Sequence, residues 1–258
     1  GSIMKKSFRL IVLLFAMLLP LSIYAGFFST PLVYNGETYD YGYVRDFQVD
    51  GISYLISELD SSIVFVSADT CLLDVTKSPE PKVVINSSYH GVVTIPEKVT
   101  YNGVDYDVRG IDMGAFQGCC DLDSVIIHDS LDEIRNYAFS GCTNLNGIYL
   151  PQGMKWIGGY AFSGCTKLKS AELPKNLINI DDGVFHGCTN LQYVTIPKGI
   201  ALLTGDIFDG CSQLKKIIIY SSTPIRIQYN GGVGTGGHFK GVSRTECTIF
   251  VPENSVAD

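Results

Sequence analysis

One pattern of apolar and polar positions recurs five times between residues 111 and 219. Each copy has an apolar residue, three variable residues, small-Phe-x-Gly-Cys, two polar residues, Leu, two polar residues and apolar-x-apolar. The copies occupy 111–127, 134–150, 157–173, 180–196 and 203–219, each beginning 23 residues after the one before. A period of roughly 20 to 50 residues is typical of a solenoid, in which no unit buries its apolar face alone. We therefore predict stacked coils over residues 89–220.

The apolar-x-apolar end of each copy predicts a β-strand, because it has period two and is rich in β-branched residues. Equivalent strands of neighbouring coils should pair in parallel, about 4.8 Å apart. Pro151, Pro174 and Pro197 follow three of these strands and should end the pairing at the margin of the sheet. The half copy "GVVTIP" at 91–96 predicts one more strand before the first full copy.

The small-Phe-x-Gly-Cys segment predicts one short helical turn that its glycine closes. Its Phe and Cys should point beneath the sheet and form two buried columns. With a period of 23 and the pattern L-x-x-apolar-x-apolar, the expected fold is an α/β solenoid of leucine-rich repeats. We expect a parallel sheet on its concave face, short helical turns on the other face, and a β-rich cap at the N-terminal end.

Five of the eight cysteines fall on the repeat: Cys119, Cys142, Cys165, Cys188 and Cys211. Disulfides are the default expectation for an exported chain. An odd number of equivalent thiols with parallel side chains fits bridges poorly, whereas a free Cys packs as a small apolar side chain. We predict a column of reduced thiols, and the spacing matches no zinc pattern. A bridge among Cys71, Cys120 and Cys247 stays open.

The residues before the repeat predict a β-rich N-terminal cap over 26–88. In "DFQVDGISYLI" at 46–56, apolar residues alternate around Asp50-Gly51, which is a two-residue hairpin turn signal. The runs at 62–67 and 82–85 add short strands. After the repeat, residues 221–258 predict an irregular glycine-rich insertion and a final capping strand, "CTIFVP".

The beginning of the chain indicates export. Gly1 and Ser2 look like a cloning remnant, and three basic residues then precede an apolar run at 10–19 that ends in Pro20 and small residues. This pattern is typical of a secretory signal peptide, so residues 1–25 should be removed. No cysteine follows the apolar run directly, which disfavours a lipoprotein anchor. We expect a secreted or cell-surface protein, with the periplasm as the alternative and no membrane insertion after signal removal.

The charge balance narrows the choice of partners. Without the signal segment the chain has 19 − 3 = 16 Lys and Arg against 26 Asp and Glu, a net charge of −10. Such a surface repels phosphate backbones and anionic lipids, so nucleic acid and membrane surfaces are disfavoured.

No residue pattern indicates catalysis, a metal or a cofactor. Residues 232–237 match G-x-G-x-x-G, but no strand and helix flank them as nucleotide binding requires. The histidines His90, His128, His186 and His238 are scattered, and the acidic pairs lack glycosidase or calcium-loop spacing. A hydrolase remains the weakest of three hypotheses.

The exposed side of the predicted sheet is the candidate binding site. Inward positions are alike in every copy, whereas outward positions vary and place apolar or aromatic side chains at Ile126, Tyr149, Tyr193, Ile218 and Tyr220. Exposed aromatics often anchor protein interfaces. We therefore predict a non-enzymatic protein-binding module. The alternative is a glycan-binding component whose tyrosines stack on sugar rings.

The units "AFSGCTNLNGIYLP" and "IGGYAFSGCTKLKSAELP" resemble BspA-type leucine-rich repeats, which occur in surface and secreted proteins of gut and oral bacteria and some mucosal parasites. The resemblance covers roughly residues 44–258. It implies a leucine-rich solenoid, adhesion to host matrix proteins or neighbouring cells, and no catalytic residues. The chain departs from the pattern in the glycine-rich insertion at 231–237 and in ending soon after its last strand.

Overall fold

The computed structural model describes residues 32–34, 37–39, 47–57, 59–60, 62–68, 70–74, 82–86, 88–221, 223–228 and 239–251. The predicted signal peptide, residues 1–25, and the glycine-rich insertion at 231–237 lie outside these residues. No helix in the described part is long and apolar enough to cross a membrane.

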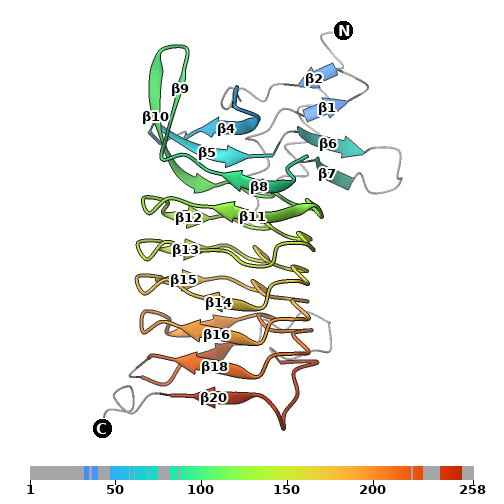
Figure 1. Ribbon diagram of the computed structural model, residues 1–258, viewed down its shortest axis with the longest axis vertical. Coiled ribbons are helices and arrows are strands. Elements are labelled where there is room, and N and C mark those ends of the chain that lie inside the picture. The colour runs from blue at the N-terminus through green and yellow to red at the C-terminus, as the bar shows by residue number, and fades with distance from the viewer. Residues whose placement is uncertain are drawn as a thin grey trace.

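The repeat forms coils that stack one below another along the molecule, and all but one of them carry a strand on the front of the stack in Figure 1. The front strands are β8 (Gly91–Thr94), β11 (Leu122–Ile126), β14 (Ser170–Glu172), β16 (Tyr193–Ile196), β18 (Lys216–Ile219) and β20 (Thr248–Phe250). They pair in parallel, and Tyr193 lies opposite Ser170 on one side and Lys216 on the other. The parallel strands predicted at the ends of four copies are thereby confirmed.

One copy departs from this prediction. Residues 147–150 form no strand, so β8 and β11 make one sheet and β14, β16, β18 and β20 another. Gly147 occupies the first outward position of this copy, where the other copies carry a side chain. Glycine weakens a strand because it costs more conformational entropy to order and packs no side chain.

A second row of strands, which the sequence did not predict, includes the first apolar residue of each copy. It comprises β10 (Val104–Ile111), β12 (Glu133–Ile134), β13 (Trp156–Ile157), β15 (Asn179–Ile180), β17 (Leu202–Thr204) and β19 (Arg226–Gln228). β10, β12, β13 and β15 pair in parallel in one sheet, and β17 pairs with β19 in another. Ile134 lies opposite Ile111 and Ile157. Two-residue strands are too short to produce a visible alternation in sequence.

The third side of each coil consists of tight turns, so the predicted helical turns are wrong: the described residues contain no helix. The N–H of Phe139 donates to the carbonyl of Ala161 in the next coil at 2.8 Å, and that of Gly141 donates to Ser163 at 2.7 Å. Because these donors bond between coils, they cannot form the i to i−4 bonds of an α-helix. Gly118, Gly141, Gly164, Gly187 and Gly210 all have φ between 71° and 77°, so the predicted role of glycine in the turn is confirmed.

The predicted phenylalanine column is confirmed and runs through the whole stack. Phe116, Phe139, Phe162, Phe185 and Phe208 are fully buried. Their neighbouring ring centroids lie 5.0 to 6.1 Å apart with nearly parallel planes. Phe239 continues the column 5.8 Å from Phe208, so the Phe-x-Gly pattern resumes after the insertion. Each buried ring contributes roughly 1.5 to 3 kcal/mol relative to exposure.

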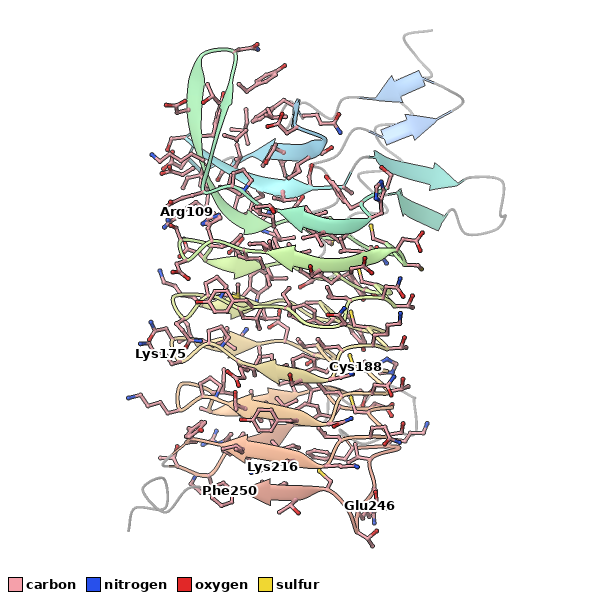
Figure 2. All side chains as sticks on the ribbon, viewed as in Figure 1. Arg109, Lys175, Cys188, Lys216, Glu246 and Phe250 are labelled. Atoms are coloured by element: carbon pink, nitrogen blue, oxygen red, sulfur yellow. The ribbon has the colours of Figure 1, made fainter. Side chains whose placement is uncertain are left out.

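The cysteine column is confirmed as well. All five repeat cysteines are buried and free, and Figure 2 places Cys188 within the stack. The thiols of Cys142 and Cys165 donate to the carbonyl oxygens of Phe116 and Phe139, at 3.0 and 3.2 Å. The column therefore fills space, and four of its thiols each donate to a backbone carbonyl of the preceding coil. Cys120 and Cys247 are also free, which leaves no bridge between them.

The N-terminal cap contains the predicted hairpin. β3 (Phe47–Val49) and β4 (Ile52–Ile56) are antiparallel, and both Asp50 and Gly51 have positive φ, at 51° and 78°. β5 (Ile63–Ser67) pairs with β4 and β10, so the cap continues the second row. A further hairpin joins β9 (Lys98–Tyr101) to β10.

A separate sheet completes the cap, with the order β2-β1-β6-β7. Its strands are β1 (Leu32–Tyr34), β2 (Glu37–Tyr39), β6 (Thr70–Asp74) and β7 (Lys82–Asn86). The sequence predicted β5 and β7 in the cap but not β1, β2 or β6.

Candidate binding surface

The strand face is the surface formed by the outward side chains of the front strands β8, β11, β14, β16, β18 and β20, together with residues 147–150. Its composition follows from the alternation of strand side chains. Inward residues such as Val125, Val194 and Ile217 belong to the core. The outward positions are therefore free to vary without disturbing the packing.

All five residues predicted for binding reach this surface. Ile126, Tyr149 and Tyr220 expose 55%, 54% and 48% of their surface. Tyr193 and Ile218 are partly buried. The structure brings Tyr193, Ile218 and Tyr220 together at β16 and β18. Ile126 lies farther along the stack, at β11, and the coils that carry Tyr149 and β14 separate it from the other three. The five residues thus follow the stack and do not form a single cluster.

Tyr193 and Tyr220 line a hollow of about 340 Å³, which we call the strand-end groove. The backbone N–H of Tyr220 donates to the carbonyl of Ile196 at 2.9 Å, which fixes it beside the end of β16. Thr195 of β16 also lines the groove and is buried. Its Oγ1 accepts a hydrogen bond from the N–H of Leu173 at 3.1 Å. The groove therefore has a fixed backbone wall and two aromatic side chains.

Polar side chains complete the strand-end groove: Gln152, Glu172, Lys175 and Lys198. Lys175 lies at the margin of the stack in Figure 2. Its backbone N–H donates to Oε1 of Gln152 at 3.1 Å. Gln152, Lys175 and Lys198 each follow the proline that ends a copy. The repeat alignment therefore places these three residues at equivalent positions, but the alternation of the strands did not identify them as candidates for binding.

Two tyrosines of the strand face are held in the neutral form. Burial raises the pKa of Tyr193, and the nearby Tyr220 and Glu172 raise it further. The hydroxyl of Tyr149 donates to Oδ1 of Asp129 at 3.0 Å, and this bond raises the pKa of Tyr149. Both side chains can therefore offer an aromatic ring and a hydroxyl group to a partner.

The structure adds apolar side chains that the sequence did not indicate at the two ends of the strand face. Val92 on β8 exposes 61% of its surface, and the outward Phe250 is exposed at the last coil. Ile249 and Val251, which alternate with Phe250, are exposed there as well. The Nζ of Lys216 lies 5.4 Å from the ring centroid of Phe250, and both residues are labelled in Figure 2. Ile249 pairs with the buried Ile217, so it is exposed because no further described coil covers it.

The titratable residues considered for catalysis stay dispersed. In the described part of the chain, no three His, Cys, Asp or Glu side chains are arranged to hold a metal ion. His186 Nε2 lies 3.9 Å from Asp209 Oδ2, whereas His128 is partly buried and burial lowers its pKa. Neither histidine lines the strand-end groove.

Stacked coils with buried Leu, Phe and Cys columns and two rows of short parallel strands define a leucine-rich repeat solenoid. Residues 109–230 match the family described as "BspA type Leucine rich repeat region" in six copies. This match covers a little less than half of the chain and agrees with the resemblance that the sequence indicated. No curated protein matches the chain significantly.

Two solved bacterial structures share the fold, and a third is similar in sequence. A leucine-rich cell surface protein from Faecalibacterium prausnitzii has a TM-score of 0.55 at 22% identity, over 80% of this chain and 54% of its own. A Treponema pallidum leucine-rich repeat protein has a TM-score of 0.53 at 22% identity, over 78% of this chain and 92% of its own. A leucine-rich repeat protein from Bacteroides ovatus is 29% identical over 69% of this chain and 50% of its own, with a TM-score of 0.47. The chain thus spans about half the length of two of these three proteins.

Proposed function

We propose that the chain is an exported, non-enzymatic leucine-rich repeat protein that binds another protein through its strand face at the cell surface. The repeat family indicates a protein-interaction or surface-protein role. The F. prausnitzii protein is described as a cell surface protein. The resemblance described above adds adhesion to matrix proteins or neighbouring cells as the expected form of that role.

The observation that carries the proposal is the row of exposed apolar and aromatic side chains on the strand face. Ile126, Tyr149 and Tyr220 each leave about half of their surface in solvent although the inward residues of the same coils are buried. Tyrosine is enriched among the anchors of protein interfaces because it offers a large rigid surface and a polar tip. A protein partner lying along the stack could contact all three.

A glycan is the second candidate, and the strand-end groove favours it. Tyr193 and Tyr220 supply aromatic surface, and Glu172, Gln152 and Lys175 supply donors and acceptors around a volume of about 340 Å³. Binding sites for small ligands combine an apolar lining with a few convergent polar groups in volumes of roughly 300 to 1,000 Å³.

Two assays on the chain from residue 26 onward separate the candidates: binding to immobilised extracellular-matrix proteins, and a glycan array. The test variant is Tyr149→Ala with Tyr193→Ala. The control is Ile178→Ala with Leu202→Ala, because these exposed apolar residues adjoin or belong to the second row of strands. We expect the test variant to weaken matrix-protein binding at least about tenfold and the control to bind normally. Unchanged binding by the test variant would overturn the role of the strand face.

A positive glycan array would support the second candidate if Tyr193→Ala with Tyr220→Ala abolished the signal and no matrix protein bound. Location is tested separately. Protease added to intact cells should cleave the protein if it reaches the surface, and full protection in intact cells would place it in the periplasm.

A further inference from the structure

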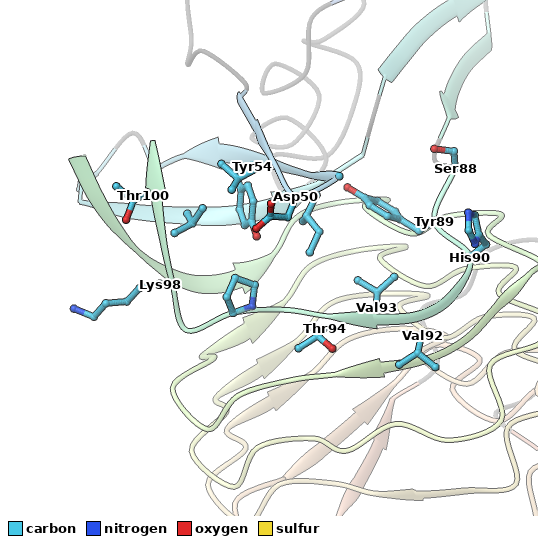
Figure 3. A pocket seen from close by; sticks show the side chains of 15 residues that line it. Asp50, Tyr54, Ser88, Tyr89, His90, Val92, Val93, Thr94, Lys98 and Thr100 are labelled. Atoms are coloured by element: carbon cyan, nitrogen blue, oxygen red, sulfur yellow. The ribbon is translucent and has the colours of Figure 1, made fainter. Parts of the chain in front are cut away.

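A second hollow, of about 830 Å³, lies between the cap and the first coil, and we call it the cap groove. Figure 3 shows Asp50 and Tyr54 of the β3–β4 hairpin on one side of it and β8, with Val92, Val93 and Thr94, on the other. Ser88 and His90 mark one end of β8, and Lys98 marks the other. The cap groove is therefore walled by a strand and by the end of a hairpin.

The strand that forms one wall has an open hydrogen-bonding edge. The N–H groups of Gly91 and Ile95 donate to the backbone carbonyl oxygens of Asp121 and Ile126, at 2.7 and 3.0 Å. Both N–H groups therefore point toward β11. Backbone groups alternate in direction along a strand, so the N–H and C=O of Val92 and Thr94 point the other way, toward the cap. Within the described part of the chain these groups have no partner, and β8 pairs with β11 alone.

Two interior front strands, unlike β8, have a neighbouring strand on both edges. β16 is paired on both edges, by β14 and β18, and β18 is paired by β16 and β20. An unpaired edge beside a hollow is a template for another extended chain. At about 3.3 Å per residue, the four residues of β8 match four residues of such a chain.

The opposite wall is rigid and carries a carboxylate, that of Asp50, which has no partner among the described residues. The hydroxyl of Tyr89 accepts the N–H of Ser53 and donates to the carbonyl of Ser67, both at 3.0 Å, which locks it between cap strands. Lys98 is paired with Asp107 at 3.2 Å. Within the described part of the chain, the ion pairs do not include Asp50, and no hydrogen bond to its carboxylate is present. The groove therefore favours a cation near the tip of the hairpin.

We propose that the cap groove binds an extended peptide segment of a partner protein, which adds a strand to β8 and places a Lys or Arg beside Asp50. Main-chain hydrogen bonds to Val92 and Thr94 supply the binding, and alternate side chains face the apolar wall around Ile52 and Val99. This site is distinct from the strand-end groove, so it functions independently of the role proposed for Tyr149 and Tyr193.

The probe is an array of seven-residue peptides in which Val, Ile or Tyr alternates with Lys, Glu or Ser, tested against the chain from residue 26 onward. Thr94→Pro removes the N–H that faces the groove without touching the bonds to β11, because that N–H is on the free edge. Thr94→Val is the matched control, since it keeps the N–H. For the best lysine-containing peptide we expect Thr94→Pro to raise the Kd at least about tenfold and Thr94→Val to leave it unchanged. Asp50→Asn should weaken the lysine-containing peptide and leave its serine counterpart unaffected.

Equal binding by Thr94→Pro and Thr94→Val, or an array on which no peptide binds, would overturn the proposal. Amide hydrogen exchange on the unaltered protein provides a test that does not depend on whether Thr94→Pro folds. The peptide should protect the amides of Val92 and Thr94, and unprotected amides at saturation would contradict strand addition. Concentration-dependent self-association that Thr94→Pro abolishes would show a second copy at this edge, and would likewise reject a partner peptide.

Discussion

At the scale of single residues, the repeat cysteine has two structural tasks. It fills a small buried space beside the phenylalanine column, and its S–H bonds to the Phe carbonyl of the preceding coil, at 3.0 Å for Cys211 and Phe185. Burial raises the pKa of the Cys165 thiol well above its usual range and raises that of Cys211 to about 12. A buried thiol with a raised pKa is a poor nucleophile, so these cysteines are structural and unreactive.

The raised thiol pKa values predict a loss of stability in alkali. An unfolded thiol loses its proton near the ordinary cysteine pKa of 9.0, whereas the folded thiol of Cys211 keeps it to about 12. The stabilising contribution is therefore complete below pH 9 and is lost as the pH rises through the folded pKa. Each buried thiol should lower the free energy of unfolding by about 1.4 kcal/mol per pH unit in this window. Urea unfolding from pH 7 to 10.5 measures the slope.

Cys165→Ala removes one thiol and should make this pH dependence shallower by about 1.4 kcal/mol per pH unit. Cys120→Ala is the control, because Cys120 is exposed. Identical slopes for the two variants would contradict the buried-thiol account. A thiol count on unfolded, unreduced protein should also find five or more free thiols, and two or fewer would show that the column is bridged.

At the scale of elements, a buried ion pair joins the cap to the first coils. Arg135 follows β12 and bonds to Asp112 through Nη1 at 3.0 Å and to Glu133 through Nε at 2.7 Å. Its guanidinium lies 4.0 Å from the ring centroid of Phe65 in β5. Burial acts to lower the pKa of Arg135, but the two carboxylates outweigh it and hold that pKa above its ordinary value. Gly110 is required here, since a Cβ would lie 2.5 Å from the Phe65 ring.

Removing the buried acid should destabilise the junction. Asp112 is only 1% exposed, so Asp112→Ala would leave Arg135 with one partner fewer in a largely buried site. We expect a loss of about 2 to 4 kcal/mol in the free energy of unfolding, measured by urea denaturation. The control is Asp132→Ala, because Asp132 pairs with Arg109 at 2.8 Å but both side chains are more than a third exposed. That variant should cost at most about 1 kcal/mol, and equal costs would refute a special role for the buried pair.

At the scale of the whole molecule, the stack is nearly one-dimensional, because each coil bonds to the coil before it and the coil after it. The Phe column shows this continuity, since it passes without a break from Phe116 to Phe239. Stability should then be approximately a sum over coils and the contacts between neighbours. The caps differ, because they must end the stack.

This organisation predicts that one whole coil can be removed. Deleting residues 143–165 joins Cys142 to Thr166 and leaves the pattern of the repeat intact. The shortened protein should keep its β-sheet circular dichroism spectrum and a cooperative, somewhat lower melting transition, because the new neighbours are equivalent. Deleting only 143–154 places Phe and strand positions out of register and should abolish the cooperative transition. If both deletions behaved alike, the coils would not be the units of stability.

Much of this architecture could be read from local patterns. The residues that recur indicate the repeat length, the buried Leu, Phe and Cys columns and the parallel front strands. This is because equivalent residues of neighbouring coils lie above one another in a stack. The turn at Asp50-Gly51 follows from residues that tolerate positive φ, and Asn102-Gly103 carried the same signal for the β9–β10 hairpin, with φ of 51° and 76°. The five outward candidates on the strand face likewise follow from alternation.

Other features depend on partners that the local sequence does not reveal. The segment around Phe139 forms turns because its N–H bonds to Ala161 in the next coil, and the two-residue strands at Ile134 and Ile157 exist only through their neighbours. The same holds for the exposed Ile249 and the open edge of β8, whose surroundings differ from those of the equivalent interior positions. The sequence by itself determined the repeating unit, since periodicity records what each coil buries. The tertiary structure alone decided the hydrogen-bond partners, the exposed coil end and the two grooves, since each depends on which coil or cap lies alongside.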